Sequence, residues 1–190
     1  MNSIIQDDLF RYEGLRSKSL MVKIRYFFFT PGFRFTYYFR KAQLANNSVS
    51  RLFWRICHRN CMLNTGIQIP VCTRIGKGFR ISHWGTIVIN GETVIGKNFN
   101  IAQGVLIGYS DGRNKGVPHI GDNVIINANA VVVGGVKIGN NVLVAPNAFV
   151  NFDVPDDSIV IGNPGRIITR NSSPTAKYLV YTVEQWFVKI

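Results

Sequence analysis

The chain contains three histidines, the side chain best suited to accept a proton near neutral pH. His83 lies beside Trp84 in the glycine-containing run 76–85, so we expect it at an exposed corner. His119 ends the stretch 108–119, which interrupts a regular pattern and is expected to loop out. His58 lies in a segment of helical character, where a partly buried structural role is expected. His83 and His119 are therefore the candidates for a general base or a substrate contact.

Metal chemistry is not expected from this sequence. Cys57, His58 and Cys61 lie close together, but the surrounding residues offer no fourth ligand of the kind that a structural zinc site needs. A catalytic zinc centre of three histidines is also not expected, because the regular part of the chain contains only His83 and His119. The three cysteines of the chain are too few for a disulfide framework and favour a reducing, cytoplasmic location.

A six-residue repeat of aliphatic residues runs through the chain from Ile69 onwards. It slips by two residues after Ile87 and is interrupted again between Ile107 and Ile120. Thirteen residues follow this spacing: Ile69, Ile75, Ile81, Ile87, Ile95, Ile101, Ile107, Ile120, Ile126, Val132, Ile138, Val144 and Val150. A period of six fits neither a helix nor a single strand, but it fits a short strand followed by a corner. Three such strands per coil predict a triangular prism with an aliphatic core. Residues with access to positive φ are expected at its corners: Gly78, Asn98, Asn123, Asn140 and Asn141.

The first third of the chain differs from the repeat and is expected to be helical. Apolar and aromatic residues run from Leu20 to Phe29 and from Phe33 towards Leu44, and Ser48 or Ser50 could cap a third helix. We expect a helical segment at 1–65, a prism at 66–168 and a tail at 169–190. The tail is expected to dock on the prism or on a neighbouring chain.

Composition excludes a disordered chain, and the strong positive charge calls for a partner or another explanation. Apolar residues make up 46% of the chain and charged residues 17%, and no apolar run is long enough to span a membrane. The net charge is +12, of which the first 66 residues carry +8 together with most of the aromatic residues. No RNA- or DNA-binding signature accompanies them, so nucleic acid is not expected as a partner. Peripheral contact with the inner face of a membrane is the alternative to simple packing of the helices.

The repeat resembles that of the hexapeptide-repeat acyltransferases. This resemblance implies a mainly β fold, a left-handed parallel β-helix with an N-terminal α-helical segment, and a homotrimer. The runs 76–89 and 103–108 resemble two active-site blocks of serine acetyltransferases, in which the histidine corresponding to His83 is the general base. The resemblance therefore implies an acetyl-CoA-dependent O-acetyltransferase in which His83 is catalytic.

Three positions depart from the serine acetyltransferase pattern. Ser82 and Gln68 stand where that family has aspartates, and Val117 stands where it has a second active-site histidine. The runs 66–70, 145–147 and 161–164 resemble those of the sugar O-acetyltransferases of capsule, O-antigen and exopolysaccharide assembly. We therefore expect a sugar hydroxyl or polysaccharide as acceptor, with Gln68, Trp84 and His119 as substrate contacts. Serine acetylation in cysteine biosynthesis and a noncatalytic β-helix scaffold are the alternatives.

The resemblance also implies a groove for acetyl-CoA between two prisms, along small residues at successive corners. The matching positions are Gly108, Tyr109, Ala128, Pro146, Asn147 and Arg166. Acyl transfer also needs a donor for the developing oxyanion, and a backbone N–H near Gly108 is expected to supply it. No metal is required for this reaction.

Overall fold

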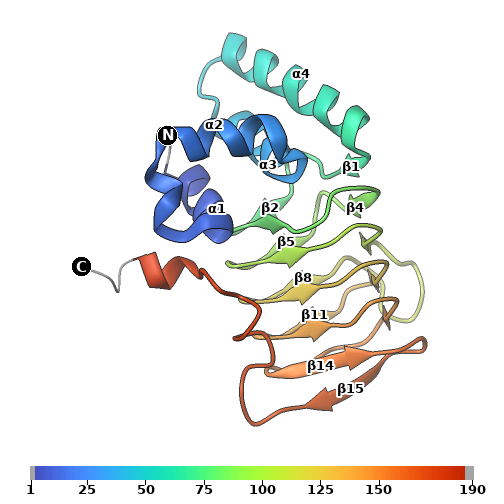
Figure 1. The fold of residues 1–190 in the computed structure, drawn as a ribbon. Coiled ribbons are helices and arrows are strands. Elements are labelled where there is room, and N and C mark those ends of the chain that lie inside the picture. Colours follow the sequence, from blue (N-terminus) through green and yellow to red (C-terminus); the bar gives the residue numbers. More distant parts are fainter. Residues whose placement is uncertain (1–2, 187–190) are drawn as a thin grey trace.

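The computed structural model describes residues 3–186, which form a helical layer at one end of a three-sided parallel β-helix (Figure 1). The helices are α1 (Ser3–Glu13), the 3₁₀ helix η1 (Gly14–Lys18), α2 (Leu20–Phe29), α3 (Pro31–Leu44), α4 (Ser48–Thr65) and, in the tail, the 3₁₀ helix η2 (Val183–Trp186). Gly66, whose backbone has the left-handed conformation, caps the C-terminus of α4, and β1 begins at Ile67. None of the helices in residues 3–186 is long and apolar enough to cross a membrane.

Within residues 3–186, fifteen short strands build three sheets, and up to β14 each strand lies in a different sheet from the strand before it. Sheet A consists of β1 (Ile67–Gln68), β4 (Ile87–Ile89), β7 (Leu106–Gly108), β10 (Val131–Val133) and β13 (Phe149–Val150). Sheet B consists of β2 (Arg74–Ile75), β5 (Val94–Ile95), β8 (His119–Ile120) and β11 (Lys137–Ile138). Sheet C consists of β3 (Arg80–Ile81), β6 (Asn100–Ile101), β9 (Ile125–Ile126), β12 (Leu143–Val144), β14 (Ser158–Ile161) and β15 (Arg166–Thr169). All pairings are parallel except that of β14 with β15.

The core of the prism is the aliphatic column that the repeat predicts. All thirteen residues of the repeat are buried, and Val154 and Val160 extend the column into the last coil. The strand pairing corrects the predicted six-residue repeat at one position. Ile89, not Ile87, pairs with Ile107, whereas Ile87 pairs with Ile67. The two-residue slip therefore lies earlier than the sequence analysis placed it, in the corner 82–86 between β3 and β4.

One corner of the prism is built from a column of stacked amides. Asn98, Asn123 and Asn141 have φ between 56° and 58°, the left-handed conformation that Asn tolerates better than most residues. The side-chain amide of each donates to the side-chain oxygen of the next residue along the column, and Asn141 donates to Asp157 at 2.9 Å. Asn140, which was also expected at a corner, does not adopt positive φ. Gly78, also expected at a corner, takes the equivalent place on the first coil with φ of 78°, so the ladder begins at Asn98.

The helical expectations are confirmed in outline and wrong at one cap. α2 spans the predicted Leu20–Phe29, and α3 begins at Pro31, where the fixed φ of proline suits the first turn. The cap of α4 is Asn47 rather than Ser48 or Ser50, because its side-chain oxygen accepts the backbone N–H of Ser50 at 2.8 Å.

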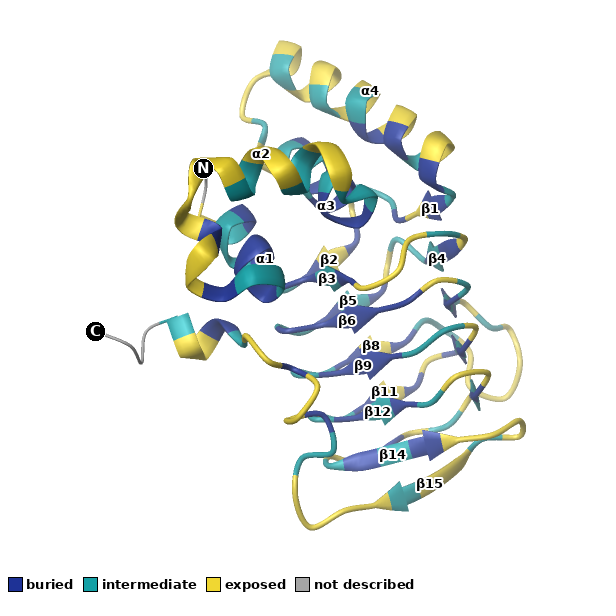
Figure 2. Ribbon diagram, in the orientation of Figure 1, coloured by how far each residue is buried: buried dark blue, intermediate teal, exposed yellow. Residues whose placement is uncertain are grey.

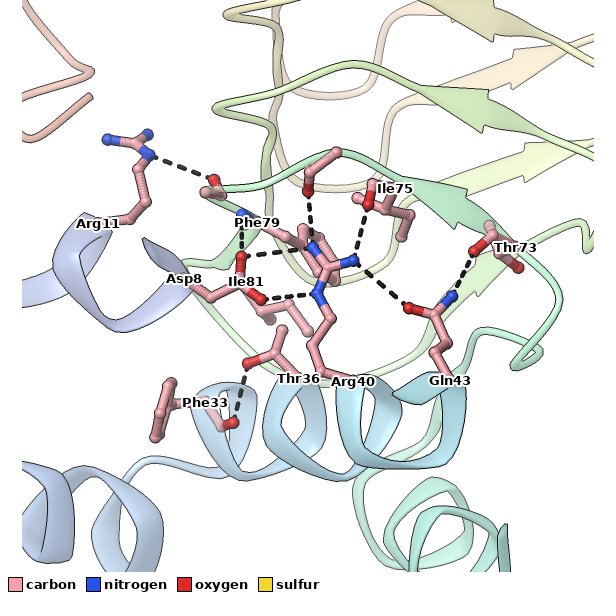
Figure 3. A network of polar contacts seen from close by, with 12 residues as sticks. Asp8, Arg11, Phe33, Thr36, Arg40, Gln43, Thr73, Ile75, Phe79 and Ile81 are labelled. Carbon is pink, nitrogen blue, oxygen red and sulfur yellow. Dashed lines mark hydrogen bonds and ion pairs between the residues drawn. The ribbon is translucent and has the colours of Figure 1, made fainter. Parts of the chain in front are cut away.

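The helical layer closes the open end of the first coil with a buried ion pair (Figure 3). Arg40 in α3 bonds Asp8 in α1 with its Nε at 2.8 Å, and both side chains are almost fully buried. The same guanidinium donates to the carbonyls of Ile75 and Gly76, and Asp8 accepts the backbone N–H of Phe79. These backbone groups have no coil above them to pair with, so the ion pair takes the place of a missing strand.

Three further side chains complete this closure. Tyr12 both donates to the carbonyl of Ile81 and accepts its N–H, each at 3.0 Å. Burial raises the pKa of Tyr12, so its hydroxyl stays protonated. Arg11 donates to the carbonyl of Gly78, and Gln43 donates to that of Thr73. Burial lowers the pKa of Arg11 to about 10, which leaves it charged near neutral pH.

The tail returns to the helical end of the prism, as Figure 1 shows. Arg11 donates to the carbonyl of Tyr181, and the ring of Trp186 lies 4.5 Å from that of Phe10. Glu184 bonds Lys97 at 2.8 Å and accepts from Asn98 at the top of the amide ladder. The predicted docking on the prism thus holds for residues up to 186, and contacts with α1 accompany it. The last part of the predicted tail, 187–190, lies outside the described residues.

Candidate active site

His83 lies in the corner between sheets C and A, at the point where the corner is two residues longer than the corners below it. Three residues, 102–104, join Ile101 to Val105 on the next coil, whereas five residues, 82–86, join Ile81 to Ile87. The extra length pushes His83 and Trp84 outward, and both are exposed, Trp84 by 54%. Within residues 3–186 the His83 ring makes no hydrogen bond or ion pair. The exposed ring is therefore available to a bound substrate.

Gln68 lies on the same side of the prism as His83 but does not bond it. Gln68 is exposed on the outer face of sheet A, where it pairs with Val88. The loop carrying His83 returns close to the start of β1, because a Cβ on Gly66 would lie 3.6 Å from the Thr86 nitrogen. Gln68 and His83 therefore flank one corner, and the structure shows no contact that would orient the imidazole through Gln68 among the described residues.

A cleft of about 410 Å³ opens on the sheet C side of this corner. Its lining joins Ser82, next to His83, to Asn127 and Pro146 on lower coils and to Tyr178 of the tail. Sequence reasoning overlooked Asn127 and Tyr178. The six-residue repeat could have identified Asn127. Asn127 follows the core residue Ile126 on its coil, just as Ser82 follows the core residue Ile81. Tyr178 could not, because its position depends on how the tail folds back.

The proposed donor-binding residues fall into three separate places. Ala128 and Pro146 occupy the same position on successive coils of the His83 corner, and Asn147 follows with φ of 60°. Gly108 instead ends β7 and pairs with Val133, the last residue of β10. Gly108 and the exposed Tyr109 thus lie at the other end of sheet A, so the expectation that Gly108 shares a corner with Ala128 and Pro146 is wrong. Arg166 is exposed at the start of β15.

His119 lies on a different side of the prism from His83. It is exposed on the outer face of sheet B, where it pairs with Val94 and Lys137. Sheet B faces away from the corner between sheets C and A, so one chain does not bring His119 and His83 together. The interruption loops out as expected, but it starts at the far end of sheet A, so within one chain His119 does not join Gln68 and Trp84 as a substrate contact beside His83.

The interruption itself is a small hairpin at the corner between sheets A and B. Ser110 and Gly116 exchange two backbone hydrogen bonds at 3.0 Å, and Asn114 donates to the carbonyl of Asn151. Tyr109 donates to Asp111 at 2.9 Å, a bond that raises the pKa of the Tyr109 hydroxyl. A cleft of about 610 Å³ lies between this hairpin and the last coils.

His58 has the structural role expected of it. It is buried in α4 against the rings of Phe35 and Phe39, and burial lowers its pKa to about 4. Its imidazole is therefore neutral at physiological pH. No group of three or more metal-ligating side chains occurs among the described residues.

Comparisons with known proteins identify the repeat and the fold. Residues 118–151 match the family described as bacterial transferase hexapeptide (six repeats). The chain is 41% identical over 114 residues to the serine acetyltransferase of Staphylococcus aureus (strain Mu50), which is 60% of this chain and 54% of that protein. Solved serine acetyltransferases have the same fold. The soybean apoenzyme is 29% identical with a TM-score of 0.72, over 87% of this chain and 68% of that one. The enzyme of Neisseria gonorrhoeae in complex with serine is 26% identical with a TM-score of 0.69, over 86% and 67%.

These similarities confirm one expectation and overturn another. The predicted fold, a left-handed parallel β-helix with an N-terminal helical segment, is confirmed. The expected sugar acceptor and the role in polysaccharide biosynthesis are contradicted, because the similar proteins are serine acetyltransferases. The expectation rested on the departures at Gln68, Ser82 and Val117 and on the resemblance of the short runs 66–70, 145–147 and 161–164 to sugar O-acetyltransferases. The similarity to a serine acetyltransferase extends over 114 residues and outweighs them. The chain spans about half the length of the S. aureus protein that it matches.

Proposed function

We propose that this chain is an acetyl-CoA-dependent serine O-acetyltransferase with His83 as its general base. The observation that carries the proposal is the exposed corner 82–86. Among the described residues it is the only lengthened corner between sheets C and A, and the imidazole of His83 makes no hydrogen bond there. The similarity to serine acetyltransferases, one of them bound to serine, supports serine as the acceptor.

The chemistry follows from the position of the imidazole. The neutral His83 ring accepts the proton of the serine hydroxyl as the oxygen attacks the acetyl carbonyl, and the ring then returns this proton to the leaving sulfur. Acetyl-CoA supplies the acetyl thioester when it is bound. The small side chains of Ala128 and Pro146, at one position of successive coils, fit a donor lying along this corner, with Asn147 and Arg166 as further contacts. Gly108 and Tyr109, at the far end of sheet A, can contribute only from a neighbouring chain.

The chain handles the imidazolium differently from its relatives. Ser82 and Gln68 can position a ring but carry no charge to stabilise a cation, and each stands where the family resemblance implies an aspartate. We expect a lower rate than a carboxylate-assisted base would give. Restoring the charge with Gln68→Asp should raise kcat, provided that the added carboxylate reaches the ring.

The proposal also includes assembly of the chain into a homotrimer. Val88, Leu106, Val131 and Phe149 form one column on the outer face of sheet A, and each remains half-exposed in the single chain. An apolar column on the face that borders the His83 corner fits coverage by a second prism. The second prism would also bring a Gly108 or His119 to the first chain's His83. Analytical ultracentrifugation tests the assembly, and a stable, active monomer would contradict it.

The decisive experiment follows CoA release from acetyl-CoA with L-serine, using wild type, His83→Ala and Arg170→Ala. Arg170 is exposed and lies far from the corner, so it serves as the control. Loss of the base should lower kcat by about 10²- to 10⁴-fold while acetyl-CoA binding persists. Equal turnover in wild type and His83→Ala would overturn the role of His83. No turnover and no acetyl-CoA binding in the wild type would favour a noncatalytic scaffold.

A further inference from the structure

The outer surface of the helical layer exposes apolar side chains that its fold does not use. α2 contains no buried residue, and Figure 2 shows exposed residues along both α2 and α4. The exposed apolar residues are Leu20, Met21, Ile24, Phe28 and Phe29 of α2 and Val49, Leu52, Phe53, Ile56 and Leu63 of α4. Phe29 and Val49 are each 81% exposed. Such a concentration exceeds the scattered exposure that is normal for a soluble surface.

Aromatic side chains connect the exposed apolar residues of α2 with those of α4 across α3. Aromatic ring contacts lead from Phe28 and Phe27 in α2, over Tyr37 in α3, to Trp54 and Phe53 in α4. A groove of about 510 Å³ between α2 and α3 runs beside this path. Leu20, Ile24 and Phe28 line it together with Lys23 and Lys41, so the groove is apolar with cationic walls.

Cations accompany this surface, and α2, α3 and α4 contain no acidic residue, although Glu13 of α1 bonds Arg25 of α2 at 2.9 Å. Arg51, Arg55 and Arg59 lie four residues apart on α4, beside its apolar stripe, and all three are exposed without a hydrogen bond or ion pair in the described chain. From Gly14 to Gly91 the sequence contains thirteen Lys and Arg and no Asp or Glu. Seven of the ten acidic residues lie beyond Gly91, in the prism and the tail. The helical end of the molecule is therefore cationic.

We propose that this surface, α2 and α4 with the groove between α2 and α3, lies on an anionic lipid bilayer. Apolar and aromatic side chains enter the interface while the arginines and lysines meet lipid phosphates, which is how amphipathic helices lie in a membrane plane. A second copy fits less well, because a two-fold contact would press the arginine stripe of one chain against that of the other. The surface lies on the helical layer, at the opposite end of the prism from β15 (Figure 1).

The test is sedimentation of the full chain with vesicles of phosphatidylcholine alone and with one quarter phosphatidylglycerol, at low and physiological salt. Three proteins are compared: wild type, Arg51→Gln/Arg55→Gln/Arg59→Gln, and a control, Arg74→Gln/Lys137→Gln/Arg170→Gln, which removes the same charge from the prism. A fourth, Met21→Ser/Phe28→Ser/Phe53→Ser, keeps the charge and removes apolar area. Circular dichroism and CoA release confirm that each variant is folded.

Wild type should bind the anionic vesicles, less tightly at higher salt. The α4 arginine variant should bind on the order of 100-fold more weakly, since each cation near an anionic leaflet contributes about fivefold. The prism variant should bind like wild type, and the apolar variant should bind more weakly. No binding to anionic vesicles at low salt would overturn the proposal. So would equal loss in the two charge variants, undiminished binding by the apolar variant, or a larger oligomer that the apolar variant dissociates.

Discussion

The first coil of the β-helix is closed by side chains, whereas its last coil is closed by backbone. At the helical end, Arg40, Asp8 and Tyr12 reach from α1 and α3 to carbonyl and N–H groups of β2 and β3. At the other end, β15 turns back and pairs with β14 along four residue pairs. The backbone groups at both edges of the stack of coils need hydrogen-bond partners. Tertiary side-chain contacts provide them at one end, and a strand adjacent in sequence provides them at the other.

The difference concerns how much each end depends on single residues. A backbone hairpin keeps its hydrogen bonds whatever side chains it carries, apart from proline. The ion pair of Arg40 and Asp8 is buried and depends on both members, because either one alone would leave a charge without a partner. Substitutions should therefore be costly at the helical end and mild at the β15 end.

The largest effect is expected for Arg40→Met. The change leaves the carboxyl of Asp8 buried without its cationic partner and removes the donors to Ile75 and Gly76, which should lower the free energy of unfolding by about 3–5 kcal/mol. Urea unfolding measures it. Arg170→Met, beside β15, removes the same charge from an exposed position and should change stability by less than about 0.5 kcal/mol. Equal losses in the two variants would refute the comparison.

An intermediate, pH-dependent effect is expected for Glu184→Gln in the tail. Burial opposes ionisation of Glu184, but hydrogen bonds from Lys97 and Asn98 outweigh it and lower its pKa from 4.5 to about 2. Because the folded-state pKa is the lower one, ionised Glu184 stabilises the fold above pH 4.5, and this contribution is lost as the pH falls towards 2. The variant should be less stable by at most about 1 kcal/mol at pH 7, since the pair is partly exposed. Melting temperatures of the two proteins should converge as the pH falls to about 2; a constant difference would contradict the assignment.

The smallest effect is expected for Ile167→Thr in β15. The side chain is 39% exposed, and the backbone pairing of Ile167 with Val160 does not depend on it. Threonine also suits a strand, so the loss should be about 0.5 kcal/mol or less by urea unfolding. A loss comparable to that of Arg40→Met would show that side-chain packing, not backbone pairing, closes this end.

The sequence predicted the prism well because its fold repeats a local rule. Each coil places one aliphatic residue inward on each strand, so a spacing of six could be read without knowing any long-range contact. The exact frame near Ile87 and Ile89 could not be read, since both are buried and only strand pairing distinguishes them. The contacts of Asp8 with Arg40 were equally out of reach, because the pairing joins residues 32 positions apart in segments of unrelated pattern.

The candidate site was predicted in part. His83 was singled out because histidine suits a general base and because its segment resembles an active-site block of serine acetyltransferases. Gly108 and His119 were misplaced relative to it, because a sequence shows the order of corners but not which of three sides a long loop leaves from. Tyr178 was missed because its position beside Ser82 depends on how the tail folds back, whereas Asn127 occupies the position of Ser82 on a lower coil and could have been inferred from the repeat.

The two extra residues in the corner 82–86 leave the pairing of every coil below them intact. Each strand pairs only with strands on the same side of neighbouring coils. A change in the length of one corner therefore does not alter the register of the other strands. The hairpin 110–116 shows the same independence on a larger scale. Corners of this prism are therefore natural sites for insertion: new loops, epitopes or sensor peptides could be grafted there while the stack beneath keeps its register.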